Sequence, residues 1–490
     1  MMLVEMRGVC KSFPGVRAVD GASFDLQAGE LHALVGENGA GKSTLIKILT
    51  GVYEADKGEI TLSGRPVSFR QPTDAQRAGI AAIYQEFTLV PALTVSANIF
   101  LGHEETSRGL LDHSRERALT GRLLGRLGVA IDPDARVAEL SVAHQQLVEI
   151  ARALARDARV LVMDEPTAAL APREVGHLFG VLRELAADGI GIIFISHRLD
   201  EVLSMAHRIT VIRDGVTLTS RKVDEFSRNV LIEQMVGRPI EQEYPKEKVP
   251  AGDVRFEVRL LSGGSVEDVS FYARQGEILG IAGLMGAGRT ELAQLIFGAL
   301  RKTSGEVLVD GQRVKIDTPR DAIRSGICLL TEDRKAHGLM LKASARDNFA
   351  LPSLKSWSRL TWIDRHLELN RFAGRVRDLG IRLSGPDQPV EELSGGNQQK
   401  LLVARWLETN SRIILFDEPT RGIDVGAKYE MYLLIGRLVT QGKVVIVISS
   451  ELPELLGICD RILVMRKGQL SGEITNVPRA TQAEIMAMAV

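Results

Sequence analysis

The sequence has few of the residues that mark several classes of protein. Its three cysteines, Cys10, Cys328 and Cys459, form no CxxC pair, which disfavours a disulfide framework and a cysteine-based metal knuckle. Aromatic residues make up only 5% of the chain and the formal net charge is -1, so neither a base-stacking platform nor a global charge for nucleic acid is expected. The apolar runs 190–195 and 444–448 are far shorter than the ~20 residues that span a bilayer. We therefore expect an intracellular protein whose contact with any membrane is peripheral.

The sequence contains a repeat that spans half the chain. The segment GENGAGKST at Gly36 reappears as GLMGAGRTE at Gly283, 247 residues later, and the pair Asp164 and Glu165 reappears as Asp417 and Glu418, 253 residues later. A chain of 490 residues is too long for one ordinary domain, so the repeat indicates two copies of one domain. The predicted division is a first domain at 1–239, a polar connector with two prolines at 240–253, and a second domain at 254–490.

Each half is predicted to be an α/β domain. Short β-rich runs at 160–163 and 413–416 alternate with helical segments such as 145–155. This alternation is typical of a mostly parallel sheet with helices packed on it.

A glycine-rich loop lies between the apolar run 31–35 and the apolar-periodic segment 45–49. Strand, glycine loop and helix in this order are the context in which GxxxxGK[ST] binds a nucleotide, because loop N–H groups surround phosphate oxygens at the helix start. Lys42 is expected to reach the β and γ phosphates, and Ser43 to ligate Mg²⁺. A purely structural glycine turn is the alternative. The predicted phosphate-binding residues are Gly36, Glu37, Asn38, Gly39, Ala40, Gly41, Lys42, Ser43 and Thr44.

Two carboxylates follow the predicted strand 160–163. We expect Asp164 to hold the Mg²⁺ shell and Glu165 to polarise the water that attacks in line during phosphoryl transfer. The pair could instead be a charge cluster at a helix N-terminus. Its occurrence together with the glycine loop favours nucleotide hydrolysis.

Five further segments carry a resemblance to a known family. They are LSGGNQQK (393–400), DEPTAAL (164–170), DEPTRGIDVGAK (417–428), TEDRKAHGL (331–339) and ISSELPE (448–454). With them, nearly the whole chain resembles the ATP-binding cassette (ABC) ATPases, and in particular the fused double-cassette ATPases of bacterial monosaccharide importers. The resemblance implies two tandem P-loop nucleotide-binding domains with ATP and Mg²⁺ as cofactors. Each domain would have a mostly parallel sheet core, a helical subdomain and an antiparallel β element.

The resemblance also implies roles for residues outside the glycine loop. Gln85 in IYQE corresponds to the glutamine that contacts Mg²⁺ and water, and His197 in ISHRLDE to the histidine that contacts the γ-phosphate. Phe13 in KSFPG corresponds to the aromatic residue that stacks on adenine. Taken singly, each of these could be an ordinary core or surface residue. The implied catalytic residues are Lys42, Gln85, Glu165 and His197, and the implied nucleotide contacts from the second half are Ser394, Gly395, Gly396, Gln398 and Asp424.

In ABC ATPases two cassettes pack head to tail, so the resemblance implies that the cassettes pair within this chain and form two composite sites. The first site, which joins the first phosphate loop to the second signature, has all its elements. In the second site, Arg289 replaces the loop lysine, Glu332 stands where Gln85 stands, and Ser450 replaces His197. The facing signature begins at Ser141 with Val142 and Ala143 in place of glycines, and Ala171 stands where the other half has Asp424.

These departures predict slow hydrolysis at the second site. A planar guanidinium does not fit a pocket shaped for an ammonium, and added side chains hold the backbone away from phosphate. Because Asp417, Glu418 and Thr290 are retained, we expect nucleotide binding there, with Thr290 and Asp417 on Mg²⁺. The alternative is drift with no nucleotide bound. The expected nucleotide contacts are Gly283, Gly286, Gly288, Arg289 and Thr290.

The function implied by the resemblance is ATP hydrolysis that energises monosaccharide import across a bacterial inner membrane, from its cytoplasmic face. The implied partners are membrane permease subunits and, through them, an extracytoplasmic sugar-binding protein, with no nucleic acid. An importer of nucleosides or signalling sugars is one alternative. A soluble double-cassette ATPase that acts on the ribosome or on nucleic acid is a weaker one, because the connector is short and zinc cysteines are absent. The apolar segments 87–93 and 339–341 are either permease-docking surfaces or core.

Overall fold

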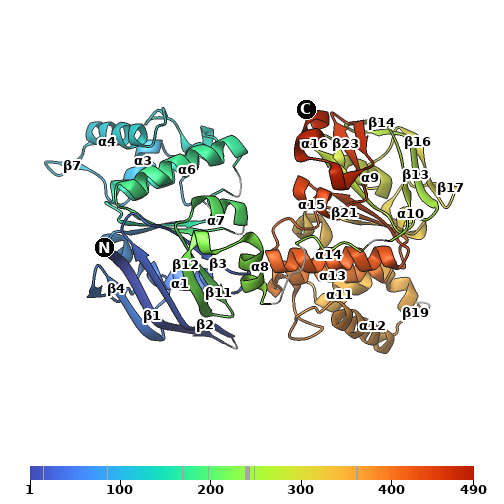
Figure 1. Cartoon of the computed structure of the whole chain (residues 1–490), viewed down its shortest axis with the longest axis horizontal. Helices are drawn as coiled ribbons and strands as arrows, with labels where there is room; N and C mark the ends of the chain where they lie inside the picture. The colour runs from blue at the N-terminus through green and yellow to red at the C-terminus, as the bar shows by residue number, and fades with distance from the viewer. Residues whose placement is uncertain are drawn as a thin grey trace. The chain divides into compact units, whose positions relative to one another are not determined.

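The computed structural model describes residues 1–14, 16–84, 87–167, 170–196, 198–237, 243–247, 249–359 and 362–490. The predicted site residues Gln85 and His197 lie outside these ranges, as do residues 240–242 and 248 of the predicted connector. The chain divides into two compact units, Met1–Ile240 and Glu241–Val490, and each is described by itself (Figure 1).

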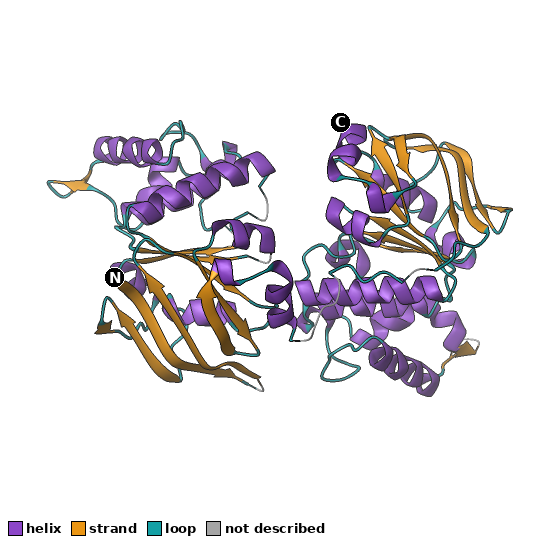
Figure 2. Ribbon diagram, viewed as in Figure 1, coloured by secondary structure: helices purple, strands orange, loops and turns teal. Residues whose placement is uncertain are grey.

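The first unit is built on a central sheet whose described strands lie in the order β12-β11-β3-β10-β9-β6. Neighbours from β11 to β6 pair in parallel, and only β12 pairs antiparallel at one edge. Strands β3 and β10 are buried along their whole length, as expected for a parallel sheet covered on both faces (Figure 2). The strands are β3 (Leu31–Val35), β6 (Ile80–Ile83), β9 (Val160–Asp164), β10 (Gly191–Ile195), β11 (Arg208–Arg213) and β12 (Val216–Lys222).

An antiparallel sheet packs beside this core, with its described strands in the order β2-β1-β4-β5. Alternating buried and exposed positions along β2 direct Ala22, Phe24 and Leu26 into the first unit's hydrophobic core. The strands are β1 (Met2–Phe13), β2 (Val16–Gln27), β4 (Lys57–Leu62) and β5 (Arg65–Pro66), and a separate short hairpin is formed by β7 (Thr106–Ser107) and β8 (Leu110–Leu111).

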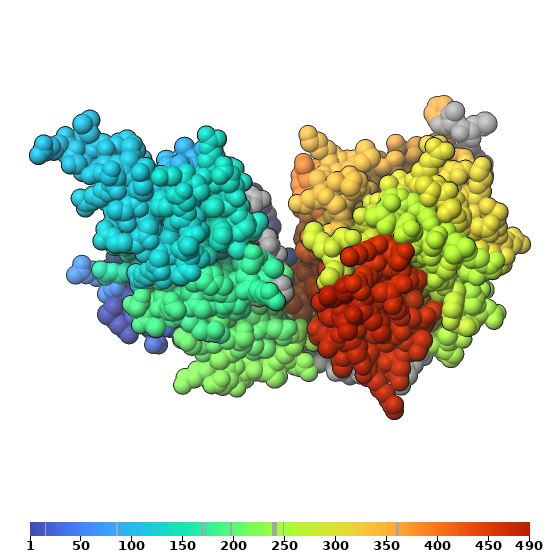
Figure 3. Space-filling model, turned by 90° about the horizontal axis from the view of Figure 1, so that it is seen from above, coloured from blue at the N-terminus to red at the C-terminus, as the bar shows by residue number. Residues whose placement is uncertain are grey.

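Helices of the first unit fall into a group on the central sheet and a helical subdomain. The subdomain is formed by α3, α4 and α5, which pack on one another. The blue-to-cyan surface around residues 100–126 forms the protruding end of this unit in Figure 3. The helices are α1 (Lys42–Leu49), α2 (Pro72–Arg77), α3 (Val95–Phe100), α4 (His113–Arg126), η1 (Val137–Glu139), α5 (Val142–Ala155), α6 (Pro172–Ala187), α7 (Leu199–Met205), η2 (Val223–Glu225) and α8 (Arg228–Val236).

The second unit repeats both sheets. Its central sheet has the described order β18-β21-β22-β15-β23-β24, and its antiparallel sheet has the order β14-β13-β16-β17. Here too only the edge strand β24 of the central sheet pairs antiparallel. The strands are β13 (Val254–Gly263), β14 (Val266–Arg274), β15 (Ile278–Gly283), β16 (Ser304–Val309), β17 (Gln312–Val314), β18 (Ile327–Leu330), β19 (Ser358–Arg359), β20 (Trp362–Ile363), β21 (Ile413–Asp417), β22 (Val444–Ile448), β23 (Arg461–Arg466) and β24 (Gln469–Ile474).

Helices α11, α12 and α13 of this unit form the corresponding helical subdomain. The C-terminal helix α16 packs on β15 and β23. The helices are α9 (Arg289–Phe297), α10 (Pro319–Arg324), η3 (Arg334–Gly338), α11 (Ala345–Ala350), η4 (Leu351–Trp357), α12 (Arg365–Asp378), η5 (Val390–Glu392), α13 (Gly395–Leu407), α14 (Val425–Thr440), α15 (Leu452–Ile458), η6 (Val477–Arg479) and α16 (Gln482–Ala489).

The predicted fold class is confirmed. Each unit combines a mostly parallel sheet, a helical subdomain and an antiparallel sheet. The predicted strands 160–163 and 413–416 are β9 and β21, which extend one residue further to Asp164 and Asp417. Within the described residues, none of the helices is both long enough and apolar enough to cross a membrane.

Candidate functional site

The first phosphate loop joins β3 to α1, as the sequence predicts. Gly36 has no room for a side chain, because a Cβ atom there would lie 2.2 Å from the carbonyl oxygen of Ile212. The Nζ atom of Lys42 donates to the carbonyl oxygens of Gly36 at 2.7 Å and Glu37 at 2.9 Å. The ammonium group therefore lies over its own loop, and Ser43 is exposed in the first turn of α1.

Asp164 is the last residue of β9, and Glu165 follows it directly. Glu165 has a left-handed φ of 49°, and its N–H donates to the carbonyl of Ile195 at 2.9 Å. Burial raises the pKa of Asp164, the charge of Glu165 raises it further, and the cations Lys42 and Lys47 act in the opposite direction. The electrostatic coupling of Asp164 to Lys42 links the strand end to the phosphate loop.

Phe13 ends β1 and is partly exposed. Its ring packs edge-on against Tyr53 with 5.2 Å between the ring centroids, and the Nζ atom of Lys47 lies 5.6 Å from the centroid of Tyr53. Because Lys47 belongs to α1, this chain of contacts connects Phe13 to the helix that follows the phosphate loop.

The second phosphate loop joins β15 to α9, but its cation points elsewhere. The Nη1 atom of Arg289 donates to the carbonyl of Ser449 at 2.7 Å, and its Nη2 atom lies 3.4 Å from Oε1 of Glu418. Ser450 donates its hydroxyl to the other oxygen of Glu418 at 3.0 Å. In this unit the residue in the lysine position therefore binds the glutamate at the end of β21.

Asp417 is buried beside this cluster, with 2% of its surface exposed. Burial raises its pKa to about 6, while a hydrogen bond from Thr290 acts in the opposite direction. Its Oδ1 atom has no hydrogen-bond partner. A buried carboxylate oxygen without a donor is uncommon in folded proteins, and it fits a site for a cation.

The second signature segment forms the start of α13. Ser394 caps the helix, and its hydroxyl accepts from the N–H of Asn397 at 3.5 Å. A Cβ atom at Gly395 would lie 2.8 Å from the guanidinium of Arg334, and one at Gly396 would lie 3.2 Å from Ala427. A side chain at Gly395 would therefore displace the Arg334 guanidinium, and one at Gly396 would push Ala427 slightly, whether or not a nucleotide is bound.

Gln398 and Asp424 have structural partners inside the second unit. Gln398 is buried, and its amide donates to the carbonyls of Val390 at 3.0 Å and Leu393 at 3.1 Å. Asp424 caps α14 by accepting from the N–H of Ala427 at 2.7 Å. Gln398 therefore holds the turn that leads into the signature rather than facing out of the unit.

The first signature keeps this architecture without the glycines. Ser141 caps α5, and the amide of Gln145 donates to the carbonyls of Val137 and Leu140, as Gln398 does in the other half. Val142 is 39% exposed, so an isopropyl group lies on the surface where the second half presents Gly395. The position of Asp424 is taken by Ala171, whose N–H is capped by Glu174 at 2.8 Å.

The apolar segments 87–93 and 339–341 divide between core and surface. Leu89 and Leu339 are 8% and 6% exposed and belong to the core. Val90 and Met340 are 38% and 57% exposed. Each of the two exposed residues is held by a buried asparagine, Asn98 or Asn348, that bonds to its backbone N–H and carbonyl.

Sequence reasoning missed the Arg289–Glu418 contact and the role of Ser450 in it. Two changes in the sequence could have indicated it, because lysine becomes arginine and histidine becomes serine at positions that flank the same glutamate.

Comparison with known proteins agrees with these features. The ABC transporter family model matches residues 19–168 and 266–421. A ribose import ATP-binding protein of Rubrobacter xylanophilus is 50% identical over 99% of this chain and 98% of its own length. A xylose import ATP-binding protein of Thermoanaerobacter pseudethanolicus is 47% identical over 99% and 98%, and a ribose import ATP-binding protein of Bacillus subtilis is 44% identical over 100% and 99%. The chain therefore belongs to the ABC transporter family, as a protein with two ATP-binding cassettes in one polypeptide, which confirms the predicted resemblance.

Proposed function

We propose that this chain hydrolyses ATP to energise the import of a monosaccharide, and that one of its two nucleotide sites performs most of the hydrolysis. The full-length similarity to ribose and xylose import ATP-binding proteins supports the transported class. The competent site would join the phosphate loop of the first unit to the signature of the second.

The observation that carries the proposal is the contrast between Lys42 and Arg289. Lys42 lies on the carbonyls of its own loop, and an incoming phosphate can recruit it over a short distance. Arg289 is bound to Glu418 and to the carbonyl of Ser449. It therefore pairs with the glutamate that would have to accept the proton from water in its own site. Oε2 of Glu418 accepts from the Ser450 hydroxyl and Oε1 is ion-paired with Arg289, which leaves the carboxylate poorly placed to accept a proton from water.

In the first site, each residue would have one task. Lys42 and the loop N–H groups would neutralise charge on the β and γ phosphates. Glu165 would accept a proton from water while the water oxygen attacks the γ-phosphorus and ADP leaves. Ser394, Gly395 and Gly396 would contact the γ-phosphate, while Gln398 would act as a positioning residue for that segment. Gln85 and His197 keep their proposed roles, although both lie outside the described residues.

Mg²⁺ fits both sites. In the first site Ser43, Gln85 and Asp164 would hold it, and in the second site Thr290 and Asp417. The raised pKa of Asp164 and the unpaired oxygen of Asp417 are what carboxylates awaiting a cation would have. When bound, the ion supplies positive charge that stabilises the charge developing on the phosphates.

The division of labour is tested by paired substitutions. We expect Glu165→Gln to remove at least about 95% of steady-state ATPase activity, roughly 2 kcal/mol or more in the barrier. The matched Glu418→Gln is expected to leave most of the activity. Equal losses in the two variants would contradict the proposal. An Asp164→Asn variant adds a check, because its loss of ATPase activity should be accompanied by a higher Mg²⁺ concentration requirement.

The proposed partners are membrane permease subunits, bound at the cytoplasmic face of the inner membrane, and through them an extracytoplasmic sugar-binding protein. The exposed residues Val90 and Met340 offer matched apolar contacts on the two units. Val90→Lys and Met340→Lys are expected to keep the basal ATPase rate and to abolish stimulation by permease vesicles. Thr73→Lys, on exposed α2, serves as the control. Unchanged stimulation would exclude these residues from docking. Stimulation by ribose or xylose with their binding proteins, compared with a nucleoside, would then identify the transported class.

A further inference from the structure

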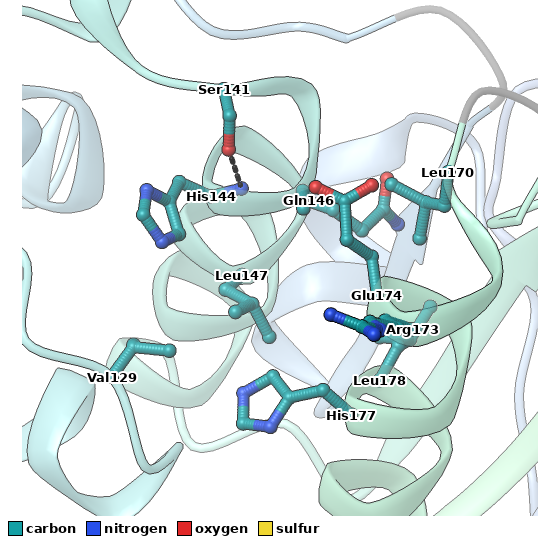
Figure 4. Close-up of a pocket in the computed structure, with 11 residues that line it drawn as sticks. Val129, Ser141, His144, Gln146, Leu147, Leu170, Arg173, Glu174, His177 and Leu178 are labelled. Atoms are coloured by element: carbon teal, nitrogen blue, oxygen red, sulfur yellow. Dashed lines mark hydrogen bonds between the residues drawn. The ribbon is translucent and has the colours of Figure 1, made fainter. Parts of the chain in front are cut away.

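A cavity of about 270 Å³ lies in the first unit between the signature helix α5 and helix α6 (Figure 4). Val129, Leu147, Leu170 and Leu178 supply apolar walls. As seen in Figure 4, the rings of His144 and His177 lie on one side of the cavity, and Gln146, Arg173 and Glu174 on the other. A concave apolar space with a few polar groups is the usual form of a small-molecule site.

The second unit fills the matching positions with an ion pair. Lys400 stands where Leu147 stands, and Glu430 where His177 stands, both 253 residues later. The Nζ atom of Lys400 lies 2.5 Å from Oε2 of Glu430 and also donates to the carbonyl of Gly380 at 3.2 Å. The first unit has replaced this pair by a leucine and an imidazole, neither of which can bridge the same gap.

The cavity also contains an unsatisfied donor. Gln146 is only 4% exposed, and its Nε2 atom has no hydrogen-bond partner. The neighbouring Gln145, by contrast, donates its side-chain amide to two carbonyls. The unpaired amide thus belongs to Gln146, which lines the cavity. A buried amide without a partner is costly, and an acceptor atom of a ligand would remove that cost.

We propose that this cavity binds a small, flat organic carboxylate. The carboxylate would accept from the Gln146 amide and the Arg173 guanidinium, while the ring would lie on Leu147 between the two imidazoles. Glu174 also lines the cavity and keeps its negative charge while it accepts from the N–H of Ala171 at 2.8 Å, so the ligand's carboxylate would lie toward Arg173 and Gln146. Ser141 and Ala143 of the first signature also line the cavity, so binding is measured without ATP to keep it apart from nucleotide binding.

The test titrates 2-naphthoate into the nucleotide-free full chain. The chain has nine histidines, so selective ¹³C labelling gives a small set of ring signals that substitution can assign. We expect the signals of His144 and His177 to shift in a saturable way, with a dissociation constant of roughly 0.1 to 1 mM, as for other fragments of this size. The neutral isostere 2-naphthamide should bind at least about threefold more weakly, because it forfeits the charge-assisted bond to Arg173.

Two variants test whether the cavity binds 2-naphthoate specifically. The double variant Leu147→Lys with His177→Glu copies the Lys400–Glu430 pair, and it should reduce 2-naphthoate affinity at least tenfold by calorimetry while the chain stays folded. Gln146→Leu keeps the shape, removes the donor, and should weaken binding at least threefold. Leu111→Lys, on the exposed β8, should change nothing. The proposal is overturned if no saturable shift appears at either imidazole, if 2-naphthamide binds as tightly as 2-naphthoate, or if the ion-pair variant binds normally.

Discussion

Arg289 and Glu418 lie 3.4 Å apart, Nη2 to Oε1, inside the second unit. They occupy the positions that Lys42 and Glu165 hold in the first unit, so a residue that should bind phosphate instead binds the residue that should accept a proton. Both side chains are largely buried, at 11% and 7% exposure. A buried ion pair of this kind is costly to separate, which favours a resting state of the second site.

Arg289→Lys is expected to release this contact. A lysine has one compact donor group and cannot bridge Glu418 and the Ser449 carbonyl as the planar guanidinium does. We expect nucleotide affinity at the second site to rise roughly tenfold, equivalent to ~1.4 kcal/mol. A fluorescent ATP analogue in a Glu165→Gln background measures this, with the exposed Arg301→Lys as the matched control. An unchanged affinity would show that the pair does not restrain the loop.

Gly41→Ala and Gly39→Ala should differ although both lie in the same loop. Both glycines have left-handed φ values, 102° and 83°, so each substitution adds strain of about 1 to 2 kcal/mol. Only at Gly41 would the new Cβ meet the backbone, 2.6 Å from the carbonyl oxygen of Ala18. We expect Gly41→Ala to destabilise the first unit by at least about 1 kcal/mol more than Gly39→Ala does, as measured by calorimetry. Equal unfolding temperatures for the two variants would argue against this contact.

Glu454→Gln should reduce the loss of unfolding free energy that the second unit shows as the pH rises. Glu454 is fully buried with hydrogen bonds from Ser449 and Thr420, and burial raises its pKa to about 7. Because the folded pKa lies above the unfolded value near 4.5, the stabilisation is present below pH 4.5 and is lost as the pH rises to 7. The loss is up to about 3 kcal/mol. Unfolding by denaturant at pH 5 and pH 8 should therefore show a smaller difference for the variant, and an identical difference would contradict the assignment.

His32 should act in the opposite direction in the first unit. Burial, together with the nearby cation Arg208, lowers its pKa to about 3. The ring donates to Thr210 at 2.7 Å, because the Thr210 hydroxyl itself donates to Ser220, which fixes the neutral tautomer.

Since the folded pKa of His32 lies below the unfolded value of 6.5, the stabilisation is present above pH 6.5 and is lost as the pH falls toward 3. His32→Gln is expected to weaken the acid dependence of unfolding between pH 6.5 and 4.5. A Leu279→Val substitution at the matched position of the second unit provides a control without a titrating group. Unaltered acid sensitivity would show that another residue governs it.

Much of the fold followed from spacing. The first glycine loop, the strand-ending acids and the apolar runs placed β3, β9 and β21 correctly, because each strand is short and apolar and ends at or just before a predicted site residue. The segments 87–93 and 339–341 could not be assigned, since Leu89 and Val90 are adjacent and both apolar, yet one is buried and the other exposed. That distinction depends on Asn98 in α3, eight residues further along the chain, whose side chain bonds to the backbone N–H and carbonyl of Val90.

The sequence by itself determined that two copies of a nucleotide-binding fold share this chain and that the second copy has an altered loop. Those conclusions depend on residue type and interval, which are local properties. Only the tertiary structure decided that Arg289 binds Glu418, that Gln398 faces inward, and that a cavity replaces an ion pair between α5 and α6. The Arg289–Glu418 contact joins residues 129 positions apart and the Lys400–Glu430 pair joins residues 30 positions apart, so both form only when the strands and helices pack.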